Sequence, residues 1–215
     1  MRFDAVVLAG GRAARLGGVP KPGIVVGGAS LLDRALAATR DAERTVVVGP
    51  PGTLPADVAP GVLLTREEPP FGGPVAGIDA GLRALAAAPA EDPARSEDPA
   101  PHVLVLAVDV PRARAAIPRL LEALDRATDA DAAWLVRADR PQWLVGAYRL
   151  AALVRALDAV RDGGSVHGVP VGRLVAGLSC VAIPDDAGLS DDVDTWDDAT
   201  RMDDMAGLDV REGTR

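Results

Sequence analysis

Runs of hydrophobic residues with the composition of β-strands recur along the chain. They cover residues 3–9, 44–49, 61–65, 102–108, 132–137, 142–148 and 178–183. Several of these runs are apolar throughout, which is typical of strands that are buried on both faces in a parallel sheet.

Segments with the apolar spacing of amphipathic helices alternate with these runs, at 30–40, 74–88, 112–128 and 149–161. Ser30 is the predicted N-cap of the first helix because Asp33 follows three residues later, the spacing of a capping box. Pro74 is predicted at the first position of the second helix. The alternation predicts an α/β fold with a mostly parallel central sheet, whose ligands bind at the carboxyl ends of the strands.

The chain has 215 residues, which is enough for one well-packed α/β domain or at most two small ones. The segment 88–101 is rich in proline, alanine and charge, and predicts a solvated loop. It has the composition of a linker as well, but the strand that follows belongs to the same sheet pattern. We therefore expect a single domain over residues 1–201. Residues 202–215 show no periodicity and predict a disordered tail.

Other sequence features bear on where the protein resides. No run approaches the roughly 18 apolar residues of a transmembrane helix. The N-terminus has an acid at Asp4 and too short an apolar run for a secretory signal. The single cysteine, Cys180, excludes an internal disulfide framework and fits a reducing compartment, so we expect a cytoplasmic protein. Its strand-like surroundings predict that Cys180 is a small core residue.

Charge is distributed unevenly along the chain. The formal net charge is −8, and residues 185–215, with 11 acids and 3 bases, carry all of it. Residues 1–40 hold six bases against two acids. A confined positive loop suits a small anionic ligand better than a nucleic acid, which needs a broad basic face. An aromatic content of 3% also offers no stacking surface for single strands. We therefore expect neither a nucleic-acid nor a membrane partner.

The first loop has the composition of a phosphate-binding loop. Gly10 and Gly11 follow the first strand, and the cations Arg12, Arg15 and Lys21 come next. Paired glycines let the backbone approach a ligand, and their N–H groups bind anions. The spacing matches neither the Walker pattern nor the dinucleotide fingerprint. The loop is long enough to wrap a triphosphate; the alternative is a flexible surface loop with solvated arginines.

Lys21 is the only lysine in the chain, and the other 22 basic residues are arginine. A compact ammonium and a planar guanidinium are not interchangeable. In phosphoryl or nucleotidyl transfer, positioning and charge neutralisation supply most of the rate enhancement. Lys21 is therefore a candidate for binding phosphate.

Carboxylates provide a candidate metal site. Asp109 follows six apolar residues at the end of a predicted strand, where it can hold Mg²⁺ beside a phosphate. The alternative role for Asp109 is to cap the helix that follows. In the acidic segment 189–199, Asp192 and Asp194 share one side of an extended chain, and either can complete the site. That segment has its own alternative, in which Asp194 or Thr195 caps a helix.

The segment 66–78 joins a strand to a helix through two prolines and two glycines. Such a rigid turn can present Arg66 or the helix N-terminus to a ligand. His102 and His167 have no partner pattern, so neither is a candidate site residue.

Together these motifs resemble those of the molybdenum cofactor guanylyltransferases. "LAGGRAARLGGVPK" is similar to the first signature of that family, and "FGGPVAGI", "AVDVP", "QWLVGAYR" and "DVDTWDD" resemble its later motifs in the same order. The resemblance extends from residue 3 to about residue 200. It implies a three-layer Rossmann-like nucleotidyltransferase fold and an Mg²⁺-dependent enzyme. The reaction would be attack by a molybdopterin phosphate on the α-phosphorus of GTP, with release of pyrophosphate.

The resemblance also implies roles for individual residues. Arg15, Lys21 and Asp109 would be catalytic, and Asp109 with Asp192 would ligate Mg²⁺. The nucleotide would be bound by Leu8, Ala9, Gly10, Gly11, Arg15, Lys21, Arg66 and Asp109. Asp192 and Asp194 would meet the molybdopterin-type acceptor. Transient contact with cofactor-delivery or target enzymes is also expected.

The chain departs from the family pattern at several positions. Pro20 stands where an aspartate often precedes the motif lysine, and Gly49 stands where an asparagine binds nucleotide. The family aspartate before the G-P turn aligns near Arg66, with Glu67 one step away. These differences leave two alternatives to guanylyl transfer open: a transferase that uses CTP or another phosphorylated acceptor, and a nucleotide-binding homologue without turnover.

Overall fold

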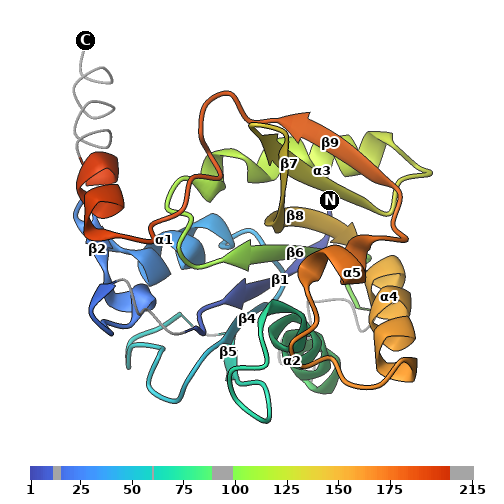
Figure 1. Cartoon of the computed structure of the whole chain (residues 1–215), viewed down its shortest axis with the longest axis horizontal. Coiled ribbons are helices and arrows are strands. Elements are labelled where there is room, and N and C mark those ends of the chain that lie inside the picture. Colours follow the sequence, from blue (N-terminus) through green and yellow to red (C-terminus); the bar gives the residue numbers. More distant parts are fainter. Residues whose placement is uncertain (12–15, 60, 89–98, 204–215) are drawn as a thin grey trace.

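A seven-stranded sheet forms the centre of the protein in a computed structural model, which describes residues 1–11, 16–59, 61–88 and 99–203 (Figure 1). The strand order is β5-β4-β1-β6-β8-β7-β9. The strands are β1 (Phe3–Leu8), β4 (Thr45–Val48), β5 (Val62–Thr65), β6 (His102–Ala107), β7 (Ala132–Arg137), β8 (Arg140–Arg149) and β9 (Cys180–Pro184). A separate hairpin consists of β2 (Val25–Val26) and β3 (Ala29–Ser30).

The sheet is mostly parallel, as the uninterrupted apolar runs predict. β1 pairs in parallel with both β4 and β6, β4 with β5, and β7 with β9. Only β8 is antiparallel to its neighbours β6 and β7. The carboxyl ends of β1, β4, β5 and β6 therefore lie along one edge. The chain order reverses around β1, which is where ligands of open α/β sheets bind.

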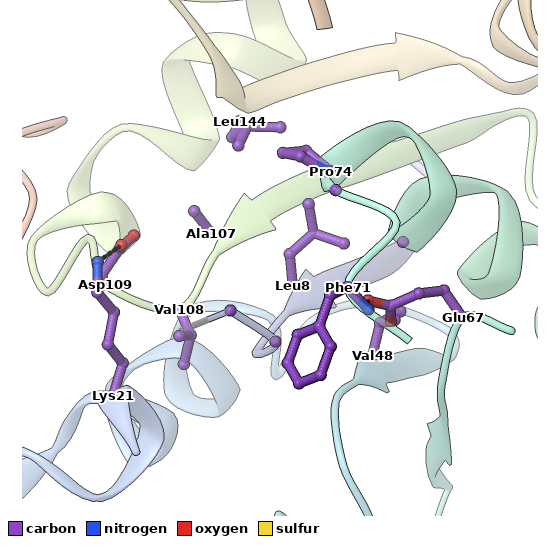
Figure 2. Close-up of a pocket in the computed structure, with 14 residues that line it drawn as sticks. Leu8, Lys21, Val48, Glu67, Phe71, Pro74, Ala107, Val108, Asp109 and Leu144 are labelled. Atoms are coloured by element: carbon purple, nitrogen blue, oxygen red, sulfur yellow. Dashed lines mark hydrogen bonds and ion pairs between the residues drawn. The ribbon is translucent and has the colours of Figure 1, made fainter. Parts of the chain in front are cut away.

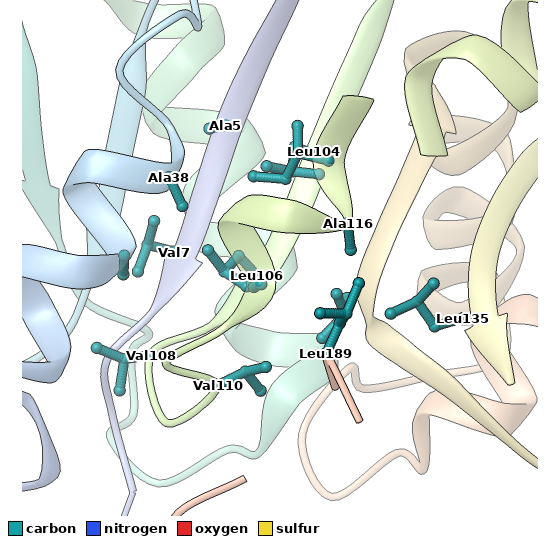
Figure 3. Packing of buried hydrophobic residues seen from close by; sticks show 14 of the residues in the cluster. Ala5, Val7, Ala38, Leu104, Leu106, Val108, Val110, Ala116, Leu135 and Leu189 are labelled. Atoms are coloured by element: carbon teal, nitrogen blue, oxygen red, sulfur yellow. The ribbon is translucent and has the colours of Figure 1, made fainter. Parts of the chain in front are cut away.

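Helices cover both faces of the sheet, which gives three layers (Figure 1). The helices are α1 (Leu31–Ala38), α2 (Pro74–Ala87), α3 (Ile117–Arg126), α4 (Leu150–Asp162) and α5 (Val171–Val175), with 3₁₀ turns η2 (Lys21–Gly23) and η3 (Ala113–Ala115). One hydrophobic cluster joins α1 and α3 to one face, and includes Val7, Leu106 and Leu189 (Figure 3). A second cluster joins α2, α4 and α5 to the other face through Val6. Neighbouring residues of β1 thus serve opposite cores.

Residues at the N-termini of the first two helices determine where these helices begin. At α1, Ser30 Oγ accepts from the Asp33 N–H at 3.0 Å, and the Asp33 carboxylate accepts from the Ser30 N–H at 3.2 Å, so the predicted capping box is confirmed. Pro74 is the first residue of α2, as predicted. The predicted helix at 112–128 is divided into η3 and α3. Pro118 lies at the start of α3, where its missing N–H costs no hydrogen bond.

The structure differs from the expectations at Cys180 and at the C-terminal boundary of the domain. Cys180 is exposed, because β9 is an edge strand and Cys180 is its first residue, so the prediction of a core cysteine is wrong. The boundary predicted between residues 201 and 202 falls inside a helix over 196–203, in which Met202 is buried. Most of the predicted loop 88–101 and the rest of the predicted tail lie outside the described residues.

None of the described helices is long and apolar enough to cross a membrane.

Candidate active site

Lys21 connects the loop after β1 to two carboxylates that are distant in the sequence. It opens the turn η2, directly after Pro20, so the chain direction at the lysine is fixed locally. Its ammonium Nζ donates to Asp109 Oδ2 at 2.6 Å and to Asp194 Oδ1 at 2.5 Å. These are charge-assisted hydrogen bonds between partly buried groups.

Backbone hydrogen bonds hold Asp109 at the carboxyl edge of the sheet. The Val108 N–H donates to Leu8 O at 3.0 Å, which extends the β1–β6 pairing, and the Val193 N–H donates to Asp109 O at 2.9 Å. The second bond brings the acidic segment to the loop after β6. Neither η3 nor α3 has a side-chain cap, which excludes the alternative that Asp109 caps the next helix.

Three carboxylates form a group with the geometry of a metal site. One oxygen each of Asp109, Asp192 and Asp194 lies within 4.8 Å of the others. Asp192 and Asp194, either of which was expected to complete a site with Asp109, thus both lie close to it. With the Lys21 ammonium, the group carries two net negative charges, so its field favours a divalent cation.

The pKa values of two groups reflect this arrangement. Burial alone lowers the pKa of Lys21, but Asp109 and Asp194 outweigh burial and raise the pKa above its usual value. Lys21 is therefore a permanent cation. Partial desolvation, together with repulsion from Asp109 and Asp194, raises the pKa of Asp192. A bound cation would relieve that repulsion.

Two further charged side chains, Arg137 and Asp185, hold the acidic segment 189–199 in place. The guanidinium of Arg137 on β7 pairs with the Asp191 carboxylate. The buried Asp185 carboxylate accepts from the N–H groups of Leu189 and Ser190, both at 2.8 Å. Burial opposes ionisation of Asp185, but its hydrogen bonds, with Ser190 Oγ first, hold its pKa below the usual range. Asp192 and Asp194 are thus held on a rigid connection.

A helix begins directly after the acidic segment. Thr195 Oγ1 accepts from the Asp198 N–H at 3.2 Å, and Asp198 Oδ2 accepts from the Thr195 N–H at 2.9 Å. This is a capping box, so the alternative role predicted for Thr195 is confirmed. It coexists with the metal-site role because Asp194 uses its side chain for Lys21 instead.

A cavity of about 600 Å³ extends from this carboxylate group along the sheet edge. Figure 2 shows Lys21 and Asp109 at one end and Glu67 at the other, with Leu8 between them. Lys21, Asp109 and Glu67 are the charged side chains among its described lining residues. The other described lining residues are apolar or glycine. The cavity therefore suits an elongated ligand with an anionic end and a planar end that donates hydrogen bonds.

A second cavity of about 610 Å³ adjoins the first. Gly10, Gly11, Lys21 and Phe71 line both, and Ala9 lines the second. The backbone φ of Gly11 is 125°, a conformation that side chains of L-residues rarely adopt, so a glycine is required there. Leu8, Ala9, Gly10 and Gly11, the residues predicted to bind nucleotide, thus line these two cavities.

Arg66 is not among the described residues that line these cavities. Arg66 was expected to bind nucleotide, but it pairs with Glu68 at 2.6 Å and lines a different groove, next to α2. The turn after β5 instead directs the neighbouring Glu67 into the main cavity. Arg15, like Arg12, lies outside the described residues.

Glu67 and Phe71 were not among the predicted ligand-binding residues. Two signals were available: Glu67 lies one step from the position of the family aspartate, and the prolines and glycines of the turn at 66–78 predict a rigid presentation of side chains but not which ones. Gly49 has a clear packing reason, because a Cβ there would lie 2.9 Å from Thr53 Oγ1. An asparagine at this position does not fit unless Thr53 moves.

Comparisons with known proteins agree with this geometry. The family model described as MobA-like NTP transferase domain matches residues 5–170. A molybdenum cofactor guanylyltransferase from Acidiphilium cryptum (strain JF-5) is 32% identical over 183 residues, which cover 85% of this chain and 84% of that protein.

Solved structures share the fold. The 2-C-methyl-D-erythritol 4-phosphate cytidylyltransferase from Thermus thermophilus has a TM-score of 0.68 and 22% identity, covering 96% of this chain and 100% of its own. A Mycobacterium tuberculosis H37Rv protein, Rv0371C, solved in complex with manganese, has a TM-score of 0.62 and 19% identity. The match covers 95% of this chain and 99% of that one.

Proposed function

Because the chain belongs to the MobA-like NTP transferase domain family and is a nucleotidyltransferase, we propose that it transfers the guanylyl group of GTP to a molybdopterin-type acceptor with release of pyrophosphate. The guanylyltransferase from Acidiphilium cryptum is a relative over most of both chains. One observation carries the proposal: an ammonium and three carboxylates meet at one end of a cavity whose other end holds a separate carboxylate.

The carboxylate group fits a divalent cation. Asp109, Asp192 and Asp194 offer hard oxygen donors, which Mg²⁺ and Mn²⁺ prefer, and their spacing allows one ion to reach all three. The manganese complex of the Mycobacterium tuberculosis relative supports the use of such a cation. We propose Mg²⁺ as the resident ion, which when bound neutralises phosphate charge and polarises the phosphorus centre.

Lys21 acts on the phosphates. Its permanently charged ammonium donates hydrogen bonds to the phosphate oxygens of GTP and offsets the charge that develops on the leaving pyrophosphate. Gly10 and Gly11 allow the nucleotide to approach the backbone. Arg15 adds a further cation in the proposal, on the strength of the sequence motif.

The reaction itself is a displacement at phosphorus. A phosphate oxygen of the acceptor forms a bond to the α-phosphorus, and the bond from that phosphorus to the bridging oxygen breaks. Pyrophosphate leaves with the bonding electron pair. Asp192 and Asp194 lie beside Asp109, which lines the cavity, so we assign them to orienting the acceptor as well as the ion.

Glu67 supports guanine as the base. An ionised carboxylate only accepts hydrogen bonds, and the Watson–Crick edge of guanine presents two neighbouring donors, N1–H and the 2-amino group. Cytosine presents one amino donor on the corresponding edge. A carboxylate at the end of the cavity remote from the phosphates therefore favours GTP over CTP.

Pyrophosphate release with each nucleotide tests the proposal. The purified protein, Mg²⁺ and a molybdopterin acceptor are expected to release pyrophosphate with GTP and far less with CTP or ATP. Omission of the acceptor should abolish release. A preference for CTP would assign the chain to cytidylyl transfer, and Mg²⁺-dependent binding of GTP without release would assign it to a binding role.

A further inference from the structure

The aromatic ring of Phe71 occupies an unusual position at the candidate site. The residue is 63% exposed, whereas the other phenylalanine of the chain, Phe3, is buried. Phe71 lines both cavities. Figure 2 shows the ring among the cavity-lining side chains, next to Glu67. A phenylalanine that lines a ligand cavity presents a large apolar surface to it.

The backbone at Phe71 is held in a conformation that phenylalanine rarely adopts. Its φ is 66°, in the left-handed region that favours glycine. Such an outlier persists only where the surrounding structure stabilises it, and outliers of this kind cluster at ligand-binding sites. A glycine would relieve the strain, so the presence of phenylalanine points to a requirement for the ring.

Neighbouring groups hold the loop that carries the ring. The Glu67 carboxylate accepts from the Phe71 N–H at 3.1 Å. On the other side, His167 Nε2 donates to Glu68 O at 3.1 Å and the Gly168 N–H donates to Gly72 O at 2.8 Å. A Cβ on Gly72 would lie 2.3 Å from His167 Nδ1, so Gly72 is required for this docking. The ring is therefore presented by a preorganised turn.

We propose that Phe71 is the base-stacking residue of the nucleotide site, and that it sets the plane in which Glu67 meets the edge of a purine base. This inference rests on the proposed function. One carboxylate thus holds the stacking residue through its N–H and reads the base. Base–aromatic stacking is tolerant of the base, because every base has a π-face, so Phe71 contributes affinity and Glu67 contributes selectivity.

Nucleotide and inorganic triphosphate titrations test this role. Phe71→Ala, Phe71→Tyr and the wild-type protein are titrated calorimetrically with GTP and with inorganic tripolyphosphate, each with Mg²⁺. Phe71→Ala is expected to raise the Kd for GTP about tenfold or more, which corresponds to about 1.4 kcal/mol. Its Kd for tripolyphosphate should change less than about twofold, and Phe71→Tyr should restore GTP binding.

Each other outcome has a distinct meaning. An unchanged Kd for GTP in Phe71→Ala overturns the stacking role while wild-type binding upholds the proposed function. Equal losses for GTP and tripolyphosphate overturn it too, since the ring would then support the phosphate site instead. If the wild-type protein binds tripolyphosphate but not GTP, or neither, the proposed function fails and the stacking role with it.

Discussion

The Lys21 ammonium lies 2.6 Å from the Asp109 carboxylate, although 88 residues separate the two in the chain. Each follows a central strand of the sheet, β1 and β6, and these strands are parallel neighbours. The fold therefore brings the only lysine of the chain to the strongest candidate metal ligand. That pairing explains why a compact ammonium occurs here when every other basic residue is arginine.

Replacement of Lys21 should impair turnover. Lys21→Ala is expected to lower the rate of pyrophosphate release at least about tenfold, or about 1.4 kcal/mol of transition-state stabilisation. Lys21→Arg should not restore the rate, because a planar guanidinium does not fit between two carboxylates at 2.5 and 2.6 Å. Arg40→Ala, which removes an exposed cation, is the matched control. Turnover of Lys21→Ala at the wild-type rate would remove Lys21 from the mechanism.

The carboxylate group should bind a cation in the absence of substrate. Asp109→Asn is expected to raise the Kd for Mn²⁺ at least about tenfold, because loss of even outer-shell partners costs about 10–100-fold in affinity. Electron paramagnetic resonance of free Mn²⁺ measures this binding directly. Asp186→Asn removes an exposed acid from the same region and should leave the Kd unchanged. Equal Mn²⁺ binding by wild type and Asp109→Asn would place the cation elsewhere.

His102 should make stability depend on pH. This histidine is buried at the start of β6, with Nδ1 donating to Arg2 O, and burial followed by the nearby Arg149 guanidinium lowers its pKa. The unfolded chain therefore takes up the proton first as the pH falls. The stabilisation is complete above the unfolded-state pKa of about 6.5 and declines as the pH falls below it.

Urea unfolding at pH 7.5 and pH 5.5 checks the direction. The wild-type free energy of unfolding should fall more between these pH values than that of His102→Gln, which has no proton to gain. Parallel changes in the two proteins would show that His102 does not titrate differently on folding.

Substitutions in the turn between β7 and β8 should increase the stability of the protein. Its two residues, Ala138 and Asp139, have φ values of 46° and 61°, both left-handed, as a type I′ turn requires. Asparagine and glycine favour these conformations. The double substitution Ala138→Asn with Asp139→Gly is expected to raise the free energy of unfolding by about 1–2 kcal/mol. Ala151→Gly, at an exposed position of α4, should instead lower it by about 1 kcal/mol. Thermal unfolding separates the two, and a lower Tm for the turn variant would contradict the turn assignment.

The apolar runs and capping residues predicted the fold well because these signals depend only on residues close together in the sequence. The apolar runs identify all seven strands of the central sheet, and the Ser30–Asp33 spacing identifies the start of α1. Cys180 was misassigned because being at the edge of a sheet depends on strand order, which no local pattern encodes. The helix containing Met202 was predicted only as an alternative, through the cap at Thr195, because its apolar face packs through tertiary contacts.

The structure brings the predicted site residues together where each of them follows a strand. Asp109, Lys21 and the glycine pair lie at strand ends, and strand order alone brings them together. In the turn after β5, by contrast, the residue that faces the cavity depends on how the whole loop packs. Arg66 and Glu67 are neighbours that both line the groove next to α2, and of the two only Glu67 also lines the main cavity. No spacing rule distinguishes them.

Glu67 should determine the preference for guanine. Glu67→Gln keeps an oxygen that can accept from the Phe71 N–H, but it replaces one of two acceptors with an amide donor. That donor opposes a donor on the guanine edge, so we expect the Kd for GTP to rise at least about tenfold, since sites built to hydrogen-bond a group discriminate strongly. ITP lacks the 2-amino group, so the wild-type protein should prefer GTP to ITP and the variant should lose that preference. Glu68→Gln, which changes the adjacent acid paired with Arg66, is the matched control and should keep it. If Glu67→Gln still prefers GTP as the wild type does, another group must read the base.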